Sequence, residues 1–146
     1  MLLVDFGAVV PVPGCSNNPS RLEKLTGDAR PNASLTFQMS LPQGAGVTPL
    51  LFFSTAPAVE EGALACGLNT SFGELLIGLG GGQLIGRLRG ATSTGSTTPF
   101  LVKIPNDPNL VDQKLWMQGA FWDAANVAPG PVFSLTNGMY LEIGAP

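Results

Sequence analysis

The stretch S-L-T-F-Q-M-S at residues 34–40 decides the fold class, because apolar and polar side chains alternate strictly along it. Successive side chains on a β-strand point to opposite faces, so Leu35, Phe37 and Met39 share one face and the polar residues between them share the other. This alternation predicts a strand with one face in a core and the other partly in water.

Similar short runs continue on both sides of this stretch, separated by Gly, Pro or Asn roughly every ten residues. We expect further strands over residues 1–10, 50–53, 72–77, 84–89, 100–104, 115–122, 132–136 and 139–143. Eight to ten short strands without a convincing amphipathic helix predict an all-β, antiparallel β-sandwich of the jelly-roll kind, with a barrel as the alternative.

Local signals predict how some of these segments are connected. The glycine-rich residues 78–83 predict a hairpin between 72–77 and 84–89, and Asn137-Gly138 predicts a second one, because Asn-Gly favours two-residue turns. Residues 21–26, R-L-E-K-L-T, could form one helical turn. Asn106 or Asp107 can cap another that begins near Pro108.

Length and composition exclude several classes of protein. The 146 residues fit one domain spanning 1–146, and charged residues make up 12%, about half the usual share of roughly 25%. With no histidine and a net charge of −3, the chain lacks the commonest general base and metal ligand, and any global basic field for nucleic acid. We therefore expect a protein that is not an enzyme, with no cofactor, no metal site and no nucleic-acid partner.

The two cysteines, Cys15 and Cys66, are not spaced as metal ligands, so a long-range disulfide is the natural interpretation. Two buried free thiols are the alternative. A disulfide persists outside a reducing cytosol, which predicts an extracellular or cell-surface location. Asn32 and Asn69 begin acceptor sequons, a weak signal of glycosylation.

The first ten residues are apolar but carry no basic residue, and Asp5 interrupts the run. They do not resemble a signal peptide, and we expect a leader to have been removed upstream of them. An apolar run near 18 residues is absent from the sequence, so we expect no membrane span.

The acidic residues offer little for catalysis. Sequence spacing cannot establish a glycosidase pair, and we expect a solvated acidic surface. Its members are Glu60, Glu61, Glu74, Asp107, Asp112, Asp123 and Glu142. Residues 106–109 with Asp112 offer oxygen ligands for calcium but lack the EF-hand spacing.

Trp116 and Trp122 stand six residues apart, so on a strand they share a face, with Phe121 on the other. We expect the two indoles to fill the core. If they are exposed instead, they form a platform that stacks on sugar rings, which would suit a polysaccharide ligand.

The apolar N-terminal run is a candidate assembly strand, because a strand at a chain end can pair with its own sheet or complete the sheet of a neighbouring copy. We expect pairing within the chain, and strand donation is the alternative. The residues concerned are Leu2, Leu3, Val4, Phe6, Val9 and Val10.

Residues 104–111 (I-P-N-D-P-N-L-V), 115–119 (L-W-M-Q-G) and 133–144 (F-S-L-T-N-G-M-Y-L-E-I-G) resemble a group of secreted bacterial β-domains. These domains end in a pattern like I-P-N-D-P-x-L-V-G-x-x-L-Y-x-Q, followed by L-S-N-G-L-x-L-x-I-G. Here Asp112 replaces the glycine of the group and Trp116 its tyrosine. The resemblance implies an exported, disulfide-bearing β module and nothing catalytic.

Together these features predict a non-catalytic extracellular module that acts by contact. The leading hypothesis is a self-associating structural subunit of a surface layer or filament, forming a homo-oligomer or polymer. The alternative is a carbohydrate-binding β-sandwich that uses Trp116 and Trp122.

Overall fold

The computed structural model describes residues 7–12, 14–15, 18, 20–40, 48–58, 66–70, 73–80, 82, 84–90, 97–123 and 132–145. Within these residues the chain forms ten β-strands and one short 3-10 helix, which confirms the predicted all-β class. The strands are β1 (Ala8–Val12), β2 (Arg21–Thr26), β3 (Ser34–Ser40), β4 (Thr48–Ser54), β5 (Leu68–Thr70), β6 (Gly73–Leu75), β7 (Leu84–Arg89), β8 (Thr97–Lys103), β9 (Lys114–Asp123) and β10 (Val132–Glu142), and the helix is η1 (Pro108–Leu110).

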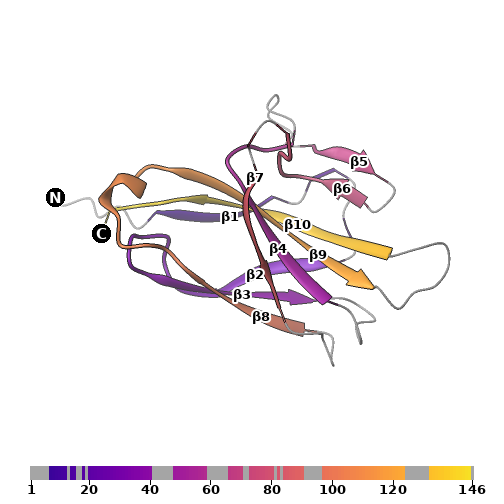
Figure 1. The fold of residues 1–146 in the computed structure, drawn as a ribbon, viewed down its shortest axis with the longest axis horizontal. Coiled ribbons are helices and arrows are strands. Elements are labelled where there is room, and N and C mark those ends of the chain that lie inside the picture. The colour runs from indigo at the N-terminus through magenta and orange to yellow at the C-terminus, as the bar shows by residue number, and fades with distance from the viewer. Residues whose placement is uncertain are drawn as a thin grey trace.

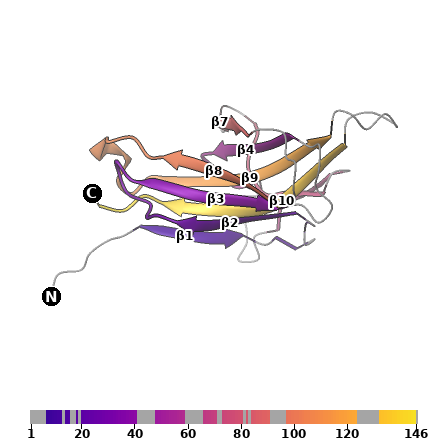
Figure 2. The same ribbon diagram turned by 90° about the horizontal axis from the view of Figure 1, so that it is seen from below.

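Two antiparallel sheets form a sandwich. The larger sheet has the strand order β1-β10-β9-β4-β7 and the smaller one β2-β3-β8. Figure 2 shows β1 and β2 on one side of the sandwich, and β4, β7 and β8 toward the other. The short pair β5–β6 lies at one end of the molecule, and η1 at the opposite end (Figure 1).

The core fills the space between the two sheets. Leu35, Phe37 and Met39 of β3 are fully buried, as their alternation predicts. Met117 and Phe121 of β9 pack into the same cluster from the larger sheet. Because each buried side chain of this size contributes about 1.5–3 kcal/mol, this cluster is the main stabilising feature of the sandwich.

Residues 21–26 form strand β2, so the expected helical turn is wrong. Leu22 is buried in the core and pairs with Met39, and the ladder runs from Arg21 to Thr26 with a bulge after Lys24. A six-residue helix is marginal in water, whereas pairing with β3 satisfies the backbone and buries Leu22.

The hairpin expected around residues 78–83 is also wrong. Strand β6 pairs with β5, and β7 pairs with β4 at the edge of the larger sheet. This arrangement sets Leu88 opposite Leu51, where both contribute to the core. Burial gained through the distant partner outweighs the local preference of glycine for a turn.

Asn137-Gly138 lies inside β10 and makes a β-bulge, not the predicted hairpin turn. Leu135 pairs with Ala120 and Gly138 pairs with Gln118, so two residues of β10 stand opposite a single residue of β9. The Asn137 carboxamide accepts a hydrogen bond from Leu22 N at 2.9 Å and donates one to Leu22 O at 3.0 Å. It therefore links β10 to β2 across the sandwich.

The predicted cap near Pro108 is confirmed. The side chain of Asp107 accepts a hydrogen bond from Asn109 N at 2.9 Å, and Pro108 stands in the first turn of η1. The Asp107 carboxylate therefore serves as the N-cap of this helix.

Candidate functional site

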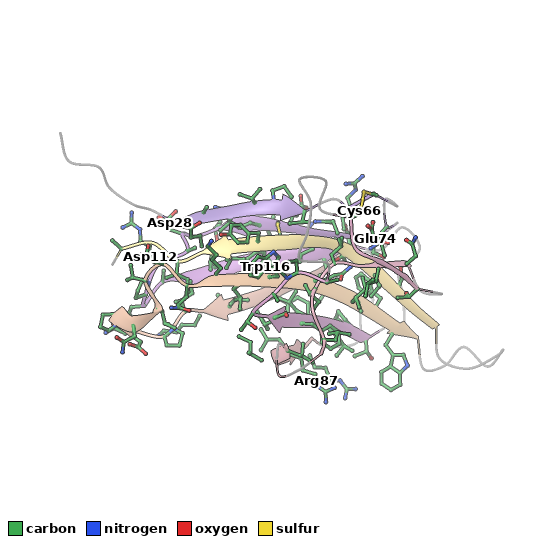
Figure 3. The ribbon with its side chains drawn as sticks, turned by 90° about the horizontal axis from the view of Figure 1, so that it is seen from above. Asp28, Cys66, Glu74, Arg87, Asp112 and Trp116 are labelled. Carbon is green, nitrogen blue, oxygen red and sulfur yellow. A yellow bond between two sulfur atoms is a disulfide. The ribbon has the colours of Figure 1, made fainter. Side chains whose placement is uncertain are left out.

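The disulfide predicted between Cys15 and Cys66 is present, with the two Cα atoms 5.1 Å apart. Glu74 lies beside it (Figure 3). The Glu74 carboxylate accepts hydrogen bonds from Cys15 N at 2.8 Å and Gly67 N at 2.6 Å, and the residue is only 1% exposed. The expectation of a solvated carboxylate is wrong at this position, because backbone N–H donors replace water around the charge.

The two sulfur atoms and a Glu74 oxygen lie within 4.8 Å of one another, a spacing that metal ligands also show. A cysteine binds metal as a thiolate, and both sulfur atoms here are joined in the disulfide. The cluster is therefore a structural junction that fixes the segments on either side of β5 and β6.

A buried amide network continues from this junction into the larger sheet. Gln118 of β9 accepts a hydrogen bond from Leu76 N at 2.8 Å and donates to Glu74 O and Thr136 O. Asn18 also donates to Glu74 O and Thr136 O, each at 2.8 Å. These bonds anchor the β6 segment to the outer face of the larger sheet, the face turned away from the core.

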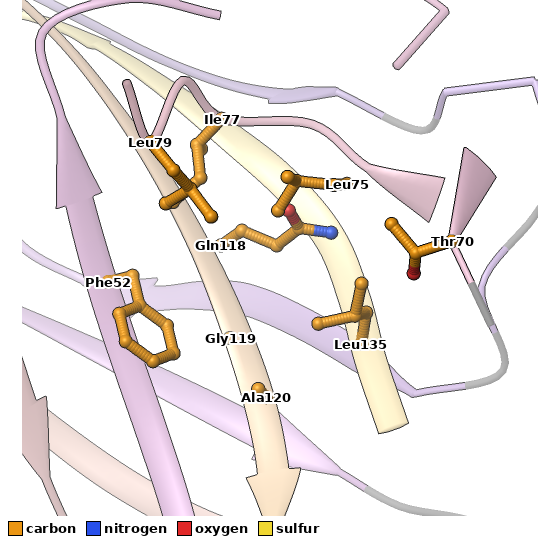
Figure 4. A pocket seen from close by; sticks show the side chains of 9 residues that line it. All are labelled: Phe52, Thr70, Leu75, Ile77, Leu79, Gln118, Gly119, Ala120 and Leu135. Atoms are coloured by element: carbon orange, nitrogen blue, oxygen red, sulfur yellow. The ribbon is translucent and has the colours of Figure 1, made fainter. Parts of the chain in front are cut away.

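An apolar cavity of about 290 Å³ lies between the β6 segment and that outer face (Figure 4). Its walls are formed by Phe52, Thr70, Leu75, Ile77, Leu79, Gln118, Gly119, Ala120 and Leu135. The Gln118 amide is engaged in the network above, and Thr70 donates to Gly73 O. Among the described residues, no acidic or basic side chain lines this cavity, so it offers no acid–base pair for catalysis.

Trp116 and Trp122 share the outer face of β9, as their spacing predicts, and both are half-buried. The expectation that they fill the core is wrong, because Met117 and Phe121 occupy the core face. Six residues of strand separate the two indoles by about 20 Å. Gln118, which lies between them, is buried under the β6 segment, so the two rings do not form one continuous platform.

Trp116 has an aromatic partner of its own. Its ring centroid lies 5.1 Å from that of Tyr140 on β10, with the planes tilted by 53°. Tyr140 donates a hydrogen bond to the Glu142 carboxylate at 3.0 Å. Burial raises the pKa of Tyr140, and the hydrogen bond and negative charge of Glu142 raise it further.

The candidate assembly strand is only partly described. Leu2, Leu3, Val4 and Phe6 lie outside the described residues, whereas Val9 and Val10 belong to β1. Val9 pairs with Leu141 and Val10 with Tyr140 of the chain's own β10, which agrees with the expected pairing within the chain.

Among the described residues, no strand or helix covers the side of the sandwich where β7 and β8 lie. A groove of about 440 Å³ runs between these two edge strands. Six partly buried hydrophobic residues pack against the core, and five of them line this groove. These five are Phe53, Leu88, Val102, Leu110 and Leu115.

Large apolar side chains at the rim of the groove are exposed to solvent. Leu101 of β8 is 67% exposed and Ile85 of β7 is 57% exposed. Edge strands that carry exposed apolar side chains invite pairing with another chain. We call this surface the open side.

Two basic residues of this acidic protein, Lys103 of β8 and Lys114, line the groove. Arg87 and Arg89 of β7 alternate with core-facing Leu88 and therefore point to the outer face of the larger sheet. Neither β7 nor β8 carries an acidic residue. Among the described residues, Lys103 and Lys114 form no ion pair, so their charges are available to a partner.

The sequence analysis placed Glu74 wrongly at the solvated surface and missed the open side, for different reasons. Glu74 stands in a short segment, F-G-E-L-L, whose apolar neighbours indicate burial, and this signal could have marked it. The open side arises from the order of strands in two sheets, which no local pattern in the sequence encodes.

No protein-family profile matches this chain, and a search of curated proteins finds no significant similarity. Among the described residues, no helix is long and apolar enough to cross a membrane.

Proposed function

We propose that this protein is a non-catalytic extracellular module that self-associates through its open side, as a structural subunit of a surface layer or filament. The groove between β7 and β8 is the observation that carries the proposal, because it leaves apolar side chains at the margin of the core uncovered. The Cys15–Cys66 disulfide supports a location outside the reducing cytosol.

The energetics of the open side favour association. Burial of a large aliphatic side chain contributes about 1.5–3 kcal/mol, and Leu101 and Ile85, which line the groove, are both substantially exposed. Each edge also presents a row of backbone groups that a further strand can pair with. A low content of charged residues weakens the repulsion between copies.

Sedimentation velocity over a wide range of protein concentrations tests this proposal. We expect discrete oligomers or regular polymers that grow with concentration. Leu101→Gln should shift the distribution toward monomer, because it removes the most exposed apolar contact of the open side. Leu68→Gln is the matched control, since Leu68 is 51% exposed but lies on β5. A strict monomer at all concentrations would contradict the proposal.

The half-exposed pair of Trp116 and Tyr140 supports carbohydrate binding as a second candidate function. Aromatic rings of this kind stack on sugar rings. We expect added polysaccharide to shift tryptophan fluorescence in the wild-type chain but not in Trp116→Ala, with Trp122→Ala as the control. An identical shift in both variants would contradict a binding site at this pair.

A further inference from the structure

The first six residues carry the pattern of a strand with two different faces. They read M-L-L-V-D-F, so an extended conformation places Leu2, Val4 and Phe6 on one face and Leu3 with Asp5 on the other. The first face is wholly apolar, and the second combines one apolar and one acidic side chain. A strand of this composition can cover an open core with one face and meet a charged rim with the other.

We propose that residues 2–6 of one copy occupy the open side of a second copy and pair with the free edge of its β8. This inference rests on the proposed function, since it specifies how self-association occurs. Among the described strands, β8 pairs with β3 alone, so its other edge is available in the smaller sheet. A donated strand there extends this sheet to four strands and closes the groove.

The side chains of β8 select the register. Phe100 and Val102 point toward the core and Leu101 and Lys103 point away from it, with buried Ile104 just beyond the strand. A parallel strand whose residue 2 stands beside residue 100 matches this alternation at every position. The pairs are Leu2 with Phe100, Leu3 with Leu101, Val4 with Val102, Asp5 with Lys103, and Phe6 with Ile104.

An antiparallel strand matches β8 less well. With Asp5 kept beside Lys103, an antiparallel direction sets Leu3 beside Pro105 and Leu2 beside Asn106. Both positions lie beyond the end of β8, and proline has no N–H to pair with. The parallel register therefore buries one more apolar residue and places every residue of the segment against strand or core.

Charge complementarity supports the same arrangement. Asp5 is the single charged residue of the segment 1–6, and the charged residues that line the groove are Lys103 and Lys114. Opposite charges on directly facing residues of neighbouring strands stabilise the pairing. The Asp5–Lys103 pair thus fixes the register as well as adding attraction.

The sheet order favours a second copy over the chain's own groove. Strand β1 stands at the edge of the larger sheet opposite to β7, with three strands between them (Figure 2). The proposed partner β8 is in the smaller sheet at the edge opposite to β2, whereas β1 lies on the β2 side of the sandwich. A strand paired with the outer edge of β8 stands three spacings, about 14 Å, from β2, but Phe6 and Ala8 are at most about 7 Å apart. Phe6 of the same chain therefore falls short of Ile104 in this register.

A cysteine cross-link between two different chains tests the proposal. One chain carries Leu3→Cys and the other Leu101→Cys, with the native disulfide kept in both. The chains are mixed with oxidised glutathione, and covalent dimers are measured by non-reducing electrophoresis and mass spectrometry. A chain with Leu68→Cys replaces the Leu101→Cys chain in the control, because its cysteine is similarly exposed on β5.

We expect at least about tenfold more dimer with Leu101→Cys than with Leu68→Cys, because docking raises the effective concentration of the two thiols. Equal yields would overturn the proposal, as would a cross-linked monomer in the chain that carries both Leu3→Cys and Leu101→Cys. If the wild-type chain forms oligomers in sedimentation but shows no selective cross-link, the donated strand is wrong and self-association stands. A strict monomer overturns both.

A charge exchange tests the register independently of new thiols. Asp5→Lys should weaken association about two- to fivefold, because it sets like charges opposite each other. Lys103→Asp in the same chain should restore the wild-type affinity. A loss that Lys103→Asp does not repair would overturn the pairing of Asp5 with Lys103.

Discussion

Replacing Asn137 distinguishes the bulge in β10 from the hairpin turn that Asn-Gly normally indicates. The Asn137 carboxamide makes two hydrogen bonds to the backbone of Leu22, whose residue is almost completely buried. Asn137→Ala removes both partners and leaves a buried N–H and C=O unsatisfied. Each lost bond with its orphaned group costs about 1–2 kcal/mol, toward the lower end of the usual range, so we expect a loss of about 2–4 kcal/mol in the free energy of unfolding.

Asn137→Asp sharpens the test, because its carboxylate can accept from Leu22 N but cannot donate to Leu22 O. We expect it to cost at least as much as Asn137→Ala at neutral pH. In a type I′ hairpin the result would differ, because Asp-Gly suits that turn nearly as well as Asn-Gly. The two geometries therefore give opposite expectations for one substitution.

The assay is unfolding by urea, with thermal unfolding as a second measurement. A loss of 2–4 kcal/mol corresponds to a fall of about 5–15 °C in Tm for a domain of this size. Asn106→Asp is the matched control, since Asn106 is exposed and we expect a change within about 0.5 kcal/mol. An Asn137→Asp chain as stable as this control would refute the role assigned to the carboxamide.

Three further predictions concern the disulfide junction and the aromatic pair. Reducing Cys15–Cys66, which closes a loop of 51 residues, should lower stability by about 4 kcal/mol, checked by urea unfolding with and without reductant. Glu74→Gln should cost about 2–4 kcal/mol in the same assay, because an amide nitrogen then faces backbone N–H donors, whereas Glu142→Gln should change stability little. Tyr140 should titrate above pH 10 by ultraviolet absorbance, and its pKa should fall toward 10 in Glu142→Gln. Because its pKa in the folded state is raised, the stability this group contributes is present below pH 10 and is lost as pH rises through the folded value.

The parts of the fold that could be predicted are those set by local alternation and local capping. Three apolar side chains of β3 face the core because every second residue of a strand lies on the same face of the sheet. These residues are Leu35, Phe37 and Met39, and all three are fully buried. Asp107 caps η1 because its donor is only two residues away. The inward face of β3 and the cap of η1 both depend on residues that are close in the sequence, so they can be predicted without the order of strands in the sheets.

The parts that could not be predicted depend on distant partners. Residues 21–26 form a strand because Leu22 pairs with Met39 of β3. Asn137 lies in a bulge, where its carboxamide accepts a hydrogen bond from the backbone N–H of Leu22. The same holds for the candidate site. Leu101 is exposed because it points away from the core, and only the strand order reveals that β8 ends its sheet and borders the groove.

Amide hydrogen exchange at low and high protein concentration tests the self-association of the open side most directly. Assembly on that side should slow exchange along β7 and β8 as concentration rises, while the β2 edge of the smaller sheet keeps its low-concentration rates. Exchange in β7 and β8 that does not change with concentration, or protection that develops on another surface, would contradict the account.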